Sequence, residues 1–380
     1  MALTQELRES ADVLCNSHLK KWKEQGGKIV AYYCPFVPEE MLVAAGAVPF
    51  ALRATGSVTA ELGDQYAHSM TCSFIRHVLD EAMRGSYEFL DGFVATNCCD
   101  PFRRMYDVWE KGRVPIPKKE LFLQLLSIPR KIEGEGVFDR VRNEFIMFKN
   151  NLEEYFNVSI TDNTLKDAIT VCNESRSILH EINDLRKQPN PPLTGEEALR
   201  IAIASESMPK EDFNKYARQF LDEHKGKQGD NGYRARLLIV GGMIDDPEYI
   251  KIIEDAGGLV VADYTCNGLM NYCNLTDEIL PPLDALVKHE LDNYLCPRML
   301  LQHKRRLYFI KDLCREYNVD GIVFQRLMFC DLWGGEGTML QWDFKDAGIP
   351  CLTLEREYVL GGVGQMRTRI QAFLETIGRY

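Results

Sequence analysis

The fold is decided by one stretch, YEFLDGFVATNCCD at residues 87–100, which recurs as YNVDGIVFQRLMFCD at residues 317–331. Each copy has a tyrosine, a short apolar step, Asp-Gly, an apolar run typical of a buried strand, and then Cys-Asp. The aspartate can cap a following helix. A repeat of this kind predicts that the two halves of the chain share one plan.

Three more strand patterns occur in the same order in both halves. Each is a short apolar run bounded by turn residues, and the first of them leads into a helix opened by proline and an acidic residue. Strands that alternate with helical stretches predict parallel sheets covered on both faces. The matched segments are 27–42 with 234–250, 47–55 with 257–265, and 121–130 with 349–358.

We therefore predict an α/β fold with two similar Rossmann-like or flavodoxin-like parallel-sheet domains and a helical segment between them. At 380 residues the chain is too long for one ordinary core. The expected parts are an N-terminal helix at 1–27, a first α/β domain at 28–130, a helical segment with linker at 131–230, and a second α/β domain at 231–380.

The composition narrows the class of protein. With 45% hydrophobic and 27% charged residues the chain is typical of a globular protein. Its net charge of -11 makes nucleic acid and anionic membrane surfaces poor partners. We find no apolar run long enough to span a membrane and no apolar core of a secretory signal near the N-terminus. A cytoplasmic location is expected, where thiols stay reduced and disulfides are rare.

Two of the twelve cysteines occupy equivalent places in the two halves. Cys99 and Cys330 each follow an apolar strand and precede an aspartate that can cap a helix. Ligands of parallel α/β sheets bind outside the carboxyl ends of the strands, and a helix N-terminus there favours the thiolate form that binds metal. Cys72 and Cys296 are expected to open the helices that run into the two Asp-Gly strands.

The other cysteines have weaker signals. Cys34 ends the first strand, but its counterpart in the second half is Gly241. Cys266 follows the second strand of the second half. The rest lie in apolar or helical surroundings and are expected to pack in the core: Cys15, Cys172, Cys273, Cys314 and Cys351.

Several kinds of site are excluded by spacing. The chain has no Cys-x-x-Cys pair, no ferredoxin run and no His-Glu-x-x-His, and neither first strand is followed by Gly-x-Gly-x-x-Gly. It also lacks a phosphate loop, so the chain itself should not hydrolyse ATP. The glycine-rich GGEGTM at residues 334–339 is equally well explained as a loop lining a site. Thiolates without histidine, brought together by two domains, favour an iron–sulfur cluster.

Longer pieces of the chain resemble the family of 2-hydroxyacyl-CoA dehydratase and ATP-dependent benzoyl-CoA reductase subunits. The resemblance covers most of the length, and LEREYVLGGVGQMRTRIQAFLE at residues 354–375 is more similar to the smaller cluster-binding (gamma, C-type) subunit of benzoyl-CoA reductase than to a dehydratase. The other pieces that carry it are residues 32–50, 53–93, 97–109 and 319–331.

This resemblance implies two domains that grip an oxygen-sensitive [4Fe-4S] cluster. The family's ligands fall on Cys72, Cys99 and Cys330, whereas Cys98 departs from the family pattern of one cysteine before the aspartate. Some relatives hold a larger double-cubane [8Fe-9S] cluster, for which Cys34, Cys98 and Cys296 would be spare thiolates. The implied partners are a second homologous catalytic subunit, an ATP-hydrolysing iron–sulfur activator, and an acyl-CoA substrate.

The expected function is that of an iron–sulfur subunit of benzoyl-CoA reductase, which passes low-potential electrons to an aromatic acyl-CoA and reduces the ring through radical intermediates. Three alternatives stay open. The chain could belong to a 2-hydroxyacyl-CoA dehydratase, which forms enoyl-CoA by radical dehydration. It could be a double-cubane reductase or electron-transfer protein whose partner holds the substrate. It could also be a non-redox binding protein whose cysteines only pack.

Five polar residues are candidates for contact with the substrate. Tyr66, His68 and Glu336 could donate protons or contact the thioester, although His68 could be a structural histidine and Glu336 merely solvated. Arg103 and Arg104 could meet CoA phosphates or acids of a partner subunit, and a plain surface salt bridge explains them equally well.

Overall fold

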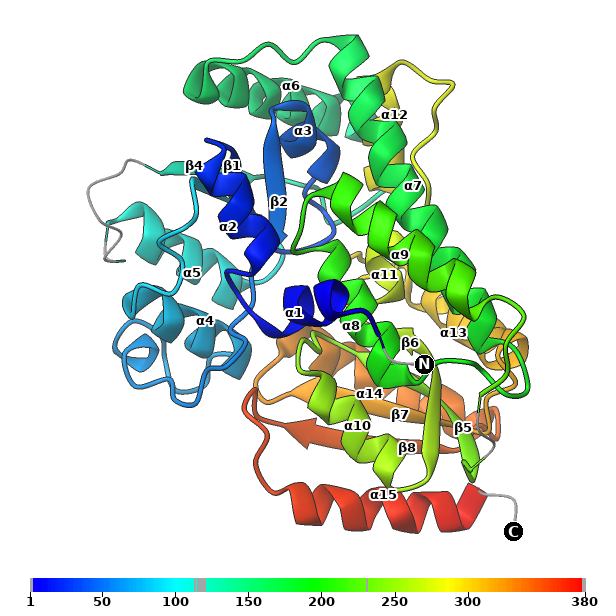
Figure 1. The fold of residues 1–380 in the computed structure, drawn as a ribbon. Helices are drawn as coiled ribbons and strands as arrows, with labels where there is room; N and C mark the ends of the chain where they lie inside the picture. Colours follow the sequence, from blue (N-terminus) through cyan, green and yellow to red (C-terminus); the bar gives the residue numbers. More distant parts are fainter. Residues whose placement is uncertain (1–2, 113, 115–120, 230–231, 378–380) are drawn as a thin grey trace.

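The computed structural model describes residues 3–112, 114, 121–229 and 232–377, and it contains two parallel sheets (Figure 1). The first sheet has the order β2-β1-β3-β4 and the second β6-β5-β7-β8. This 2-1-3-4 order is that of flavodoxin-like domains. The prediction of two similar parallel-sheet α/β units is confirmed. Their strands are β1 (Lys28–Tyr32), β2 (Ala47–Ala51), β3 (Gly92–Thr96), β4 (Phe122–Leu126), β5 (Ala235–Gly241), β6 (Gly258–Tyr264), β7 (Gly321–Leu327) and β8 (Cys351–Arg356).

The strand register shows that the repeat extends to single residues. In the first sheet Val30 pairs with Gly92, and in the second Leu237 pairs with Gly321. The two Asp-Gly steps therefore stand at the same place in both sheets. Cys34 follows Val30 by four residues, and Gly241 follows Leu237 by four residues. Gly241, at the end of β5, therefore takes the position that Cys34 has after β1.

Helices cover both faces of each sheet, as apolar runs in parallel strands require. The first sheet packs on one side against α2 (Ser17–Glu24), α4 (Ser73–Met83) and α5 (Asp100–Glu110). Its other side packs against α3 (Glu39–Ala44) and α6 (Val137–Phe156). The second sheet lies between α10 (Pro247–Asp255) with α15 (Val363–Ile377) and α13 (His303–Glu316) with α14 (Asp331–Asp346).

The segment between the two sheets is helical, as predicted, but it does not stand apart from them. It holds α6, α7 (Asp162–Arg186), α8 (Gly195–Ser205) and α9 (Lys210–His224). While α6 covers the first sheet, α8 places Leu199 and Ile203 in the core of the second. The N-terminal region forms two helices where one was expected: α1 (Gln5–Asp12), which packs on α8, and α2, which is capped by Asn16.

One part of the second half crosses to the first. Helix α12 (Pro282–Asp292) packs on α6 and α7, on the opposite side of the molecule from α15 (Figure 1). Its Leu286 joins the first sheet's core, and Asp284 accepts a hydrogen bond from Arg142 at 2.7 Å. The loop that follows, residues 293–302, stays there, since Leu300 N donates to the Arg130 carbonyl. The two short helices not yet named are η1 (Gly63–Gln65) and α11 (Leu269–Tyr272).

Within the described residues, none of the helices combines the length and apolar character needed to cross a membrane.

Candidate functional site

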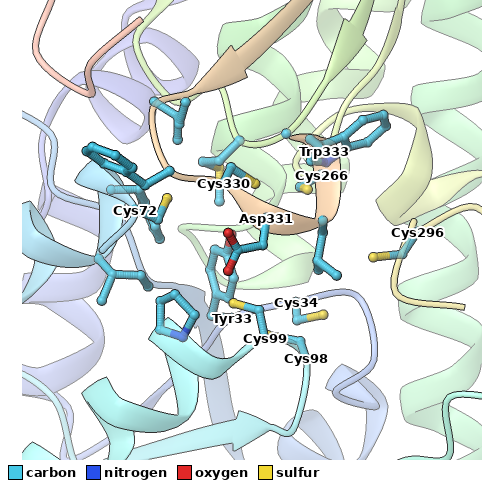
Figure 2. A pocket seen from close by; sticks show the side chains of 18 of the residues that line it. Tyr33, Cys34, Cys72, Cys98, Cys99, Cys266, Cys296, Cys330, Asp331 and Trp333 are labelled. Atoms are coloured by element: carbon cyan, nitrogen blue, oxygen red, sulfur yellow. The ribbon is translucent and has the colours of Figure 1, made fainter. Parts of the chain in front are cut away.

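A pocket with a volume of about 70 Å³ lies between the carboxyl ends of the two sheets and is lined by seven cysteines (Figure 2). Figure 2 shows Cys98 and Cys99 below the pocket and Cys330 above it, with Cys72 and Cys296 on opposite sides. The strand order of each sheet reverses at the pair β1/β3 or β5/β7, where flavodoxin-like domains bind ligands. The seven cysteines are Cys34, Cys72, Cys98, Cys99, Cys266, Cys296 and Cys330.

Three of these cysteines occupy the same local structure. Cys72, Cys99 and Cys330 are the N-cap residues of α4, α5 and α14, and none of them forms a side-chain capping hydrogen bond. Helix N-termini have N–H groups without partners in the helix and a positive dipole end. Three helices thus direct positive potential towards the same pocket, which stabilises anionic sulfur there.

The backbone around the pocket is strained at two points. Cys34 has a φ of 90° and Phe329, next to Cys330, has a φ of 63°. Residues other than glycine rarely adopt this region, and when they do they are held there by the surrounding structure, often at functional sites. Each of the two lies just past the end of a central strand, β1 or β7, so the strain re-aims the chain where it enters the pocket.

The thiols interact with one another in two groups. A hydrogen bond with Cys72, and then burial, raises the pKa of Cys330 well above its usual value. On the first-sheet side a hydrogen bond with Cys34 raises the pKa of Cys98. Burial raises the pKa of Cys34, but hydrogen bonds from Cys98 and the Phe36 amide, with the charge of Arg298, outweigh it and bring the pKa below the ordinary value.

Burial dominates at two further cysteines: it raises the pKa of Cys266 well above the ordinary value and that of Cys296 to about 12. Thiols in such surroundings stay protonated until a cation replaces the proton.

The donor set fits a polynuclear iron–sulfur group better than a single metal ion. Among the described residues, no histidine lines the pocket, and Asp331 is its one carboxylate. In the described ranges, no three Cys, His, Asp or Glu side chains converge closely enough to hold one ion. The sulfurs instead surround a cavity, and sets of thiolates without imidazole are typical of iron–sulfur clusters.

Apolar side chains form the rest of the wall. Tyr33 stacks on Phe74 and Phe102, with ring centroids 5.1 and 4.6 Å apart, and Trp333 lies beside Cys266 (Figure 2). Such a wall excludes water and strengthens electrostatic interactions inside it. These aromatic residues had no signal in the sequence that would separate them from ordinary core residues.

The structure brings the three predicted ligand positions, Cys72, Cys99 and Cys330, to one pocket, together with the predicted spare thiols Cys34, Cys98 and Cys296. Cys266 is the seventh cysteine of the pocket lining. Its only signal in the sequence was its position after a predicted strand. Cys296 does not open a helix as expected. It lies in the loop of residues 293–302 that crosses to the first sheet, called here the crossing loop, and α13 begins seven residues later at His303. The proline that follows Cys296 starts a turn, closed by a hydrogen bond from Met299 N to the Cys296 carbonyl.

The polar candidates lie outside the pocket lining. Tyr66 is partly buried and packs against the hydrophobic core of the first sheet. His68 is exposed, and its Nδ1 accepts a hydrogen bond from Met70 N at 3.1 Å. Arg104 is also exposed, and Arg103 lies 3.6 Å from Asp100 in an exposed ion pair.

Glu336 is neither on a loop nor solvated. Residues 334–339 are part of α14, and close packing requires one of their glycines, because a Cβ at Gly337 would collide with the ring of Phe324. Glu336 is 4% exposed and accepts two hydrogen bonds from Arg306, both at 2.8 Å, and one from His303. Burial raises the pKa of this carboxyl, but Arg306 outweighs it and holds the pKa below the ordinary value. A carboxylate in this state is a poor proton donor.

Comparison with known proteins identifies the family of the chain. The family model described as 2-hydroxyglutaryl-CoA dehydratase, D-component, matches residues 34–377. The chain is 26% identical over 359 residues, 94% of each chain, to the beta subunit of (R)-phenyllactyl-CoA dehydratase from Clostridium sporogenes. It is 22% identical over 366 residues to a subunit of benzoyl-CoA reductase from Thauera aromatica, covering 94% of this chain and 93% of the relative.

A third relative is the beta subunit of (R)-2-hydroxyglutaryl-CoA dehydratase from Acidaminococcus fermentans, 22% identical over 367 residues, 94% of this chain and 95% of the relative. All three relatives are named as subunits of enzymes, and each matches this chain over nearly its whole length. Together with the family model, which matches the chain from just after β1 to the end of α15, they show that the chain belongs to the 2-hydroxyglutaryl-CoA dehydratase D-component family.

Proposed function

We propose that the chain is the iron–sulfur subunit of an oxygen-sensitive enzyme that acts on acyl-CoA thioesters, and that Cys72, Cys99 and Cys330 hold a [4Fe-4S] cluster. The observation that carries the proposal is the pocket of seven thiols at the ligand-binding ends of both sheets, with no histidine among the described residues of its lining. Three ligands from three helix N-termini would leave one iron open to substrate or water.

When bound, the cluster would supply one-electron chemistry at low potential. The chain's own part is to bind and tune it. The helix N-termini at Cys72, Cys99 and Cys330 offset the negative charge of the thiolates. Tyr33 and its aromatic neighbours exclude water from the pocket. Because the chain has no phosphate loop, we propose that a separate ATP-hydrolysing iron–sulfur activator delivers the electrons.

The reaction that we propose first is reduction of an aromatic acyl-CoA, as in benzoyl-CoA reductase, with a second homologous subunit as partner. Support comes from the relative named as a benzoyl-CoA reductase subunit and from the segment 354–375. Radical dehydration of a 2-hydroxyacyl-CoA is the second candidate. It is favoured by the higher identity, 26% against 22%, to a subunit of phenyllactyl-CoA dehydratase and by the name of the matching family model.

An anaerobic assay separates the two reactions. The chain is combined with its partner subunit and a reduced activator, and is offered benzoyl-CoA or phenyllactyl-CoA. Consumption of benzoyl-CoA with loss of its aromatic absorbance supports the reductase, whereas formation of an enoyl-CoA from phenyllactyl-CoA without net use of electrons supports the dehydratase. Turnover of neither compound by a complex that contains iron would contradict both.

Metal content tests the cluster itself. Iron and sulfide are counted on anaerobically purified wild-type protein, and Mössbauer spectra are recorded. Each of Cys72→Ser, Cys99→Ser and Cys330→Ser should lower the iron content strongly. Cys351→Ser is the matched control, because Cys351 starts β8 and lies outside the pocket lining. Full iron content in all three pocket variants would refute the ligand set.

The four further thiols favour a larger cluster as an alternative. Cys34 and Cys98 are hydrogen-bonded to each other, and Cys266 and Cys296 complete the lining on that side. A count near eight irons, falling by about half in Cys98→Ser, would support a double-cubane [8Fe-9S] cluster. A count near four that Cys98→Ser leaves unchanged would assign these thiols to packing.

A further inference from the structure

Arg298 is a fully buried cation beside the cysteine pocket. It is 1% exposed and lies in the crossing loop, two residues after Cys296. Its guanidinium donates to Asn97 Oδ1 at 2.6 Å and to the Ile128 and Pro129 carbonyls at 2.5 and 3.2 Å, all at the carboxyl end of the first sheet. The side chain thus ties the loop from the second half to the residue that precedes Cys98.

Among the described residues, no carboxylate forms an ion pair with this arginine. Each of its hydrogen-bond partners there is uncharged, its Nε has none, and the ring of Phe36 lies 4.9 Å from its Cζ. Arg176, Arg186 and Arg306 are also buried and pair with Glu40, Asp263 and Glu336. Arg53 and Arg236 are buried as well and are held, like Arg298, by uncharged partners. Carbonyl partners compensate a buried guanidinium only in part, so an anion in the adjacent thiol pocket would stabilise Arg298 further.

Glu290 is an acid whose pKa is influenced by Arg298, but the two form no ion pair among the described residues. It is 3% exposed, and its Oε1 has no hydrogen-bond partner in the part of the chain that the structure describes. Burial, and then the charge of Cys34, raises the pKa of Glu290 well above its ordinary value, against the opposing effect of Arg298. Burial and Cys34 thus both disfavour the charged form of Glu290, which makes it a poor counter-charge for Arg298.

The remaining source of negative charge is sulfur. Arg298 lies within electrostatic reach of the sulfurs of both Cys34 and Cys296. Cys98 follows Asn97, the residue that Arg298 holds, and all three thiols line the same end of the pocket. Thiolates bound to metal stay anionic, and they would provide the charge that Arg298 lacks.

We propose that Arg298 is a positioning residue that acts as the counter-charge of an anionic thiolate–metal centre at the Cys34, Cys98 and Cys296 end of the pocket, and that it raises the reduction potential of that centre. This inference rests on the proposed function, and within it on the larger cluster, because it needs metal bound by thiolates at the Cys34, Cys98 and Cys296 end of the pocket; a four-iron count that Cys98→Ser leaves unchanged would overturn it. A positive charge held in a low-dielectric wall stabilises the reduced form, which has one more negative charge than the oxidised form.

The test uses the full chain, loaded anaerobically with iron and sulfide. Arg298→Met removes the charge and keeps the length, whereas Arg298→Lys keeps the charge. Arg236→Met is the matched control, because Arg236 is also buried and donates to backbone carbonyls, of Tyr317 and Arg186, at the end of β5 away from the pocket. Two quantities are measured: the midpoint potential against a low-potential chemical reductant, and the rise in melting temperature that loading confers.

In Arg298→Met we expect reduction to become about tenfold less favourable, a fall of about 59 mV for one electron. The rise in melting temperature on loading should also be smaller, because the loaded variant lacks the positive charge that offsets the anionic centre, whereas the empty protein has no such centre to offset. Arg298→Lys should keep both the midpoint potential and the rise in melting temperature on loading near their wild-type values. Arg236→Met should lower the melting temperatures of the empty and the loaded protein equally and leave the potential unchanged.

A loaded Arg298→Met protein with the wild-type potential, or an Arg298→Lys protein as impaired as Arg298→Met, would overturn the proposal. Arg298→Gln keeps a donor for the Ile128 carbonyl and decides the question if Arg298→Met does not fold. If both neutral variants fail to fold, Arg298 is a structural residue and the proposal is wrong. A wild-type protein that takes up no iron would overturn the proposed function and this inference with it, an outcome distinct from unchanged potentials in loaded variants.

Discussion

The hydroxyl of Tyr358 joins the two α/β units behind the cysteine pocket, and its removal should loosen their contact. Tyr358 follows β8 and is 7% exposed. Its hydroxyl donates to Asp245 Oδ2 at 2.6 Å in the second unit and accepts from Ala54 N at 3.1 Å in the first. The ring packs on Phe74, which lines the pocket, with centroids 5.6 Å apart.

The expected effect of Tyr358→Phe follows from these contacts. The change removes two hydrogen bonds. Asp245 stays buried and loses the hydrogen bond that Tyr358 donates to its Oδ2, while its Oδ1 already has no partner among the described residues. Loss of a buried hydrogen bond to an acidic group reduces stability by about 1.5–3 kcal/mol. We therefore expect the free energy of unfolding to fall by about 2 kcal/mol, and the pocket thiols to react faster with a thiol reagent under native conditions.

Denaturant unfolding of the cofactor-free protein measures the stability, and the rate of thiol labelling measures the opening of the pocket. Tyr308→Phe is the neutral control, since Tyr308 is 62% exposed. Tyr87→Phe is the second control: it removes a buried hydrogen bond to the Arg53 carbonyl within the first unit, and should lower stability without faster labelling. A loss below about 0.5 kcal/mol in Tyr358→Phe, with labelling unchanged, would refute the role of this contact.

Three further changes test other parts of the structure. Burial raises the pKa of Glu254 to about 7 although three backbone amides oppose it, so its contribution to stability is fully present below pH 4.5 and is lost as the pH rises through about 7. Between pH 5 and pH 8 the free energy of unfolding of the wild type should therefore fall by about 2 kcal/mol more than that of Glu254→Gln. Equal pH slopes for the two proteins would contradict this. Arg306→Met leaves Glu336 buried without its cation and should destabilise the fold by about 3–5 kcal/mol in denaturant unfolding, whereas the double change with Glu336→Gln should recover part of the loss. Gly241→Ala should reduce stability by more than about 1 kcal/mol in the same assay, because the new Cβ would collide with the Gln325 carbonyl; an unaffected variant would show that the strand can shift.

The two sheets could be predicted because their signals are local. An apolar run of five to seven residues such as Gly92–Thr96 or Gly321–Leu327, followed by a polar residue that opens a helix, specifies strand, turn and helix within one short window. The same window places Cys99 and Cys330 at N-caps, and a repeat of the window in both halves indicates a shared role. Pairing of equivalent strands then follows from the few topologies that parallel sheets allow.

Residues outside these windows were placed less well. GGEGTM has three glycines and was compatible with a loop, but a long amphipathic helix whose Gly337 lies against Phe324 accommodates all of them. Cys296 precedes a proline, which suits a helix start and a turn equally, and packing against the first core selected the turn. Gly241 takes the position of Cys34 in the repeat because a side chain there would collide with Gln325 of the neighbouring strand.

By itself, the sequence determined the four matched strands of each half, the family, and the positions of Cys99 and Cys330 at helix starts, because these depend on neighbours a few residues away. Only the tertiary structure decided that Cys34, Cys266 and Cys296 face the same pocket, that α12 and the loop of Arg298 cross to the first sheet, and that Glu336 is bound by Arg306 away from it. These outcomes depend on which apolar faces and buried charges meet between segments that lie 30 to more than 200 residues apart in the chain. Such contacts are selected by packing and by the electrostatic cost of an unpaired charge, and neither leaves a pattern in a local stretch of sequence.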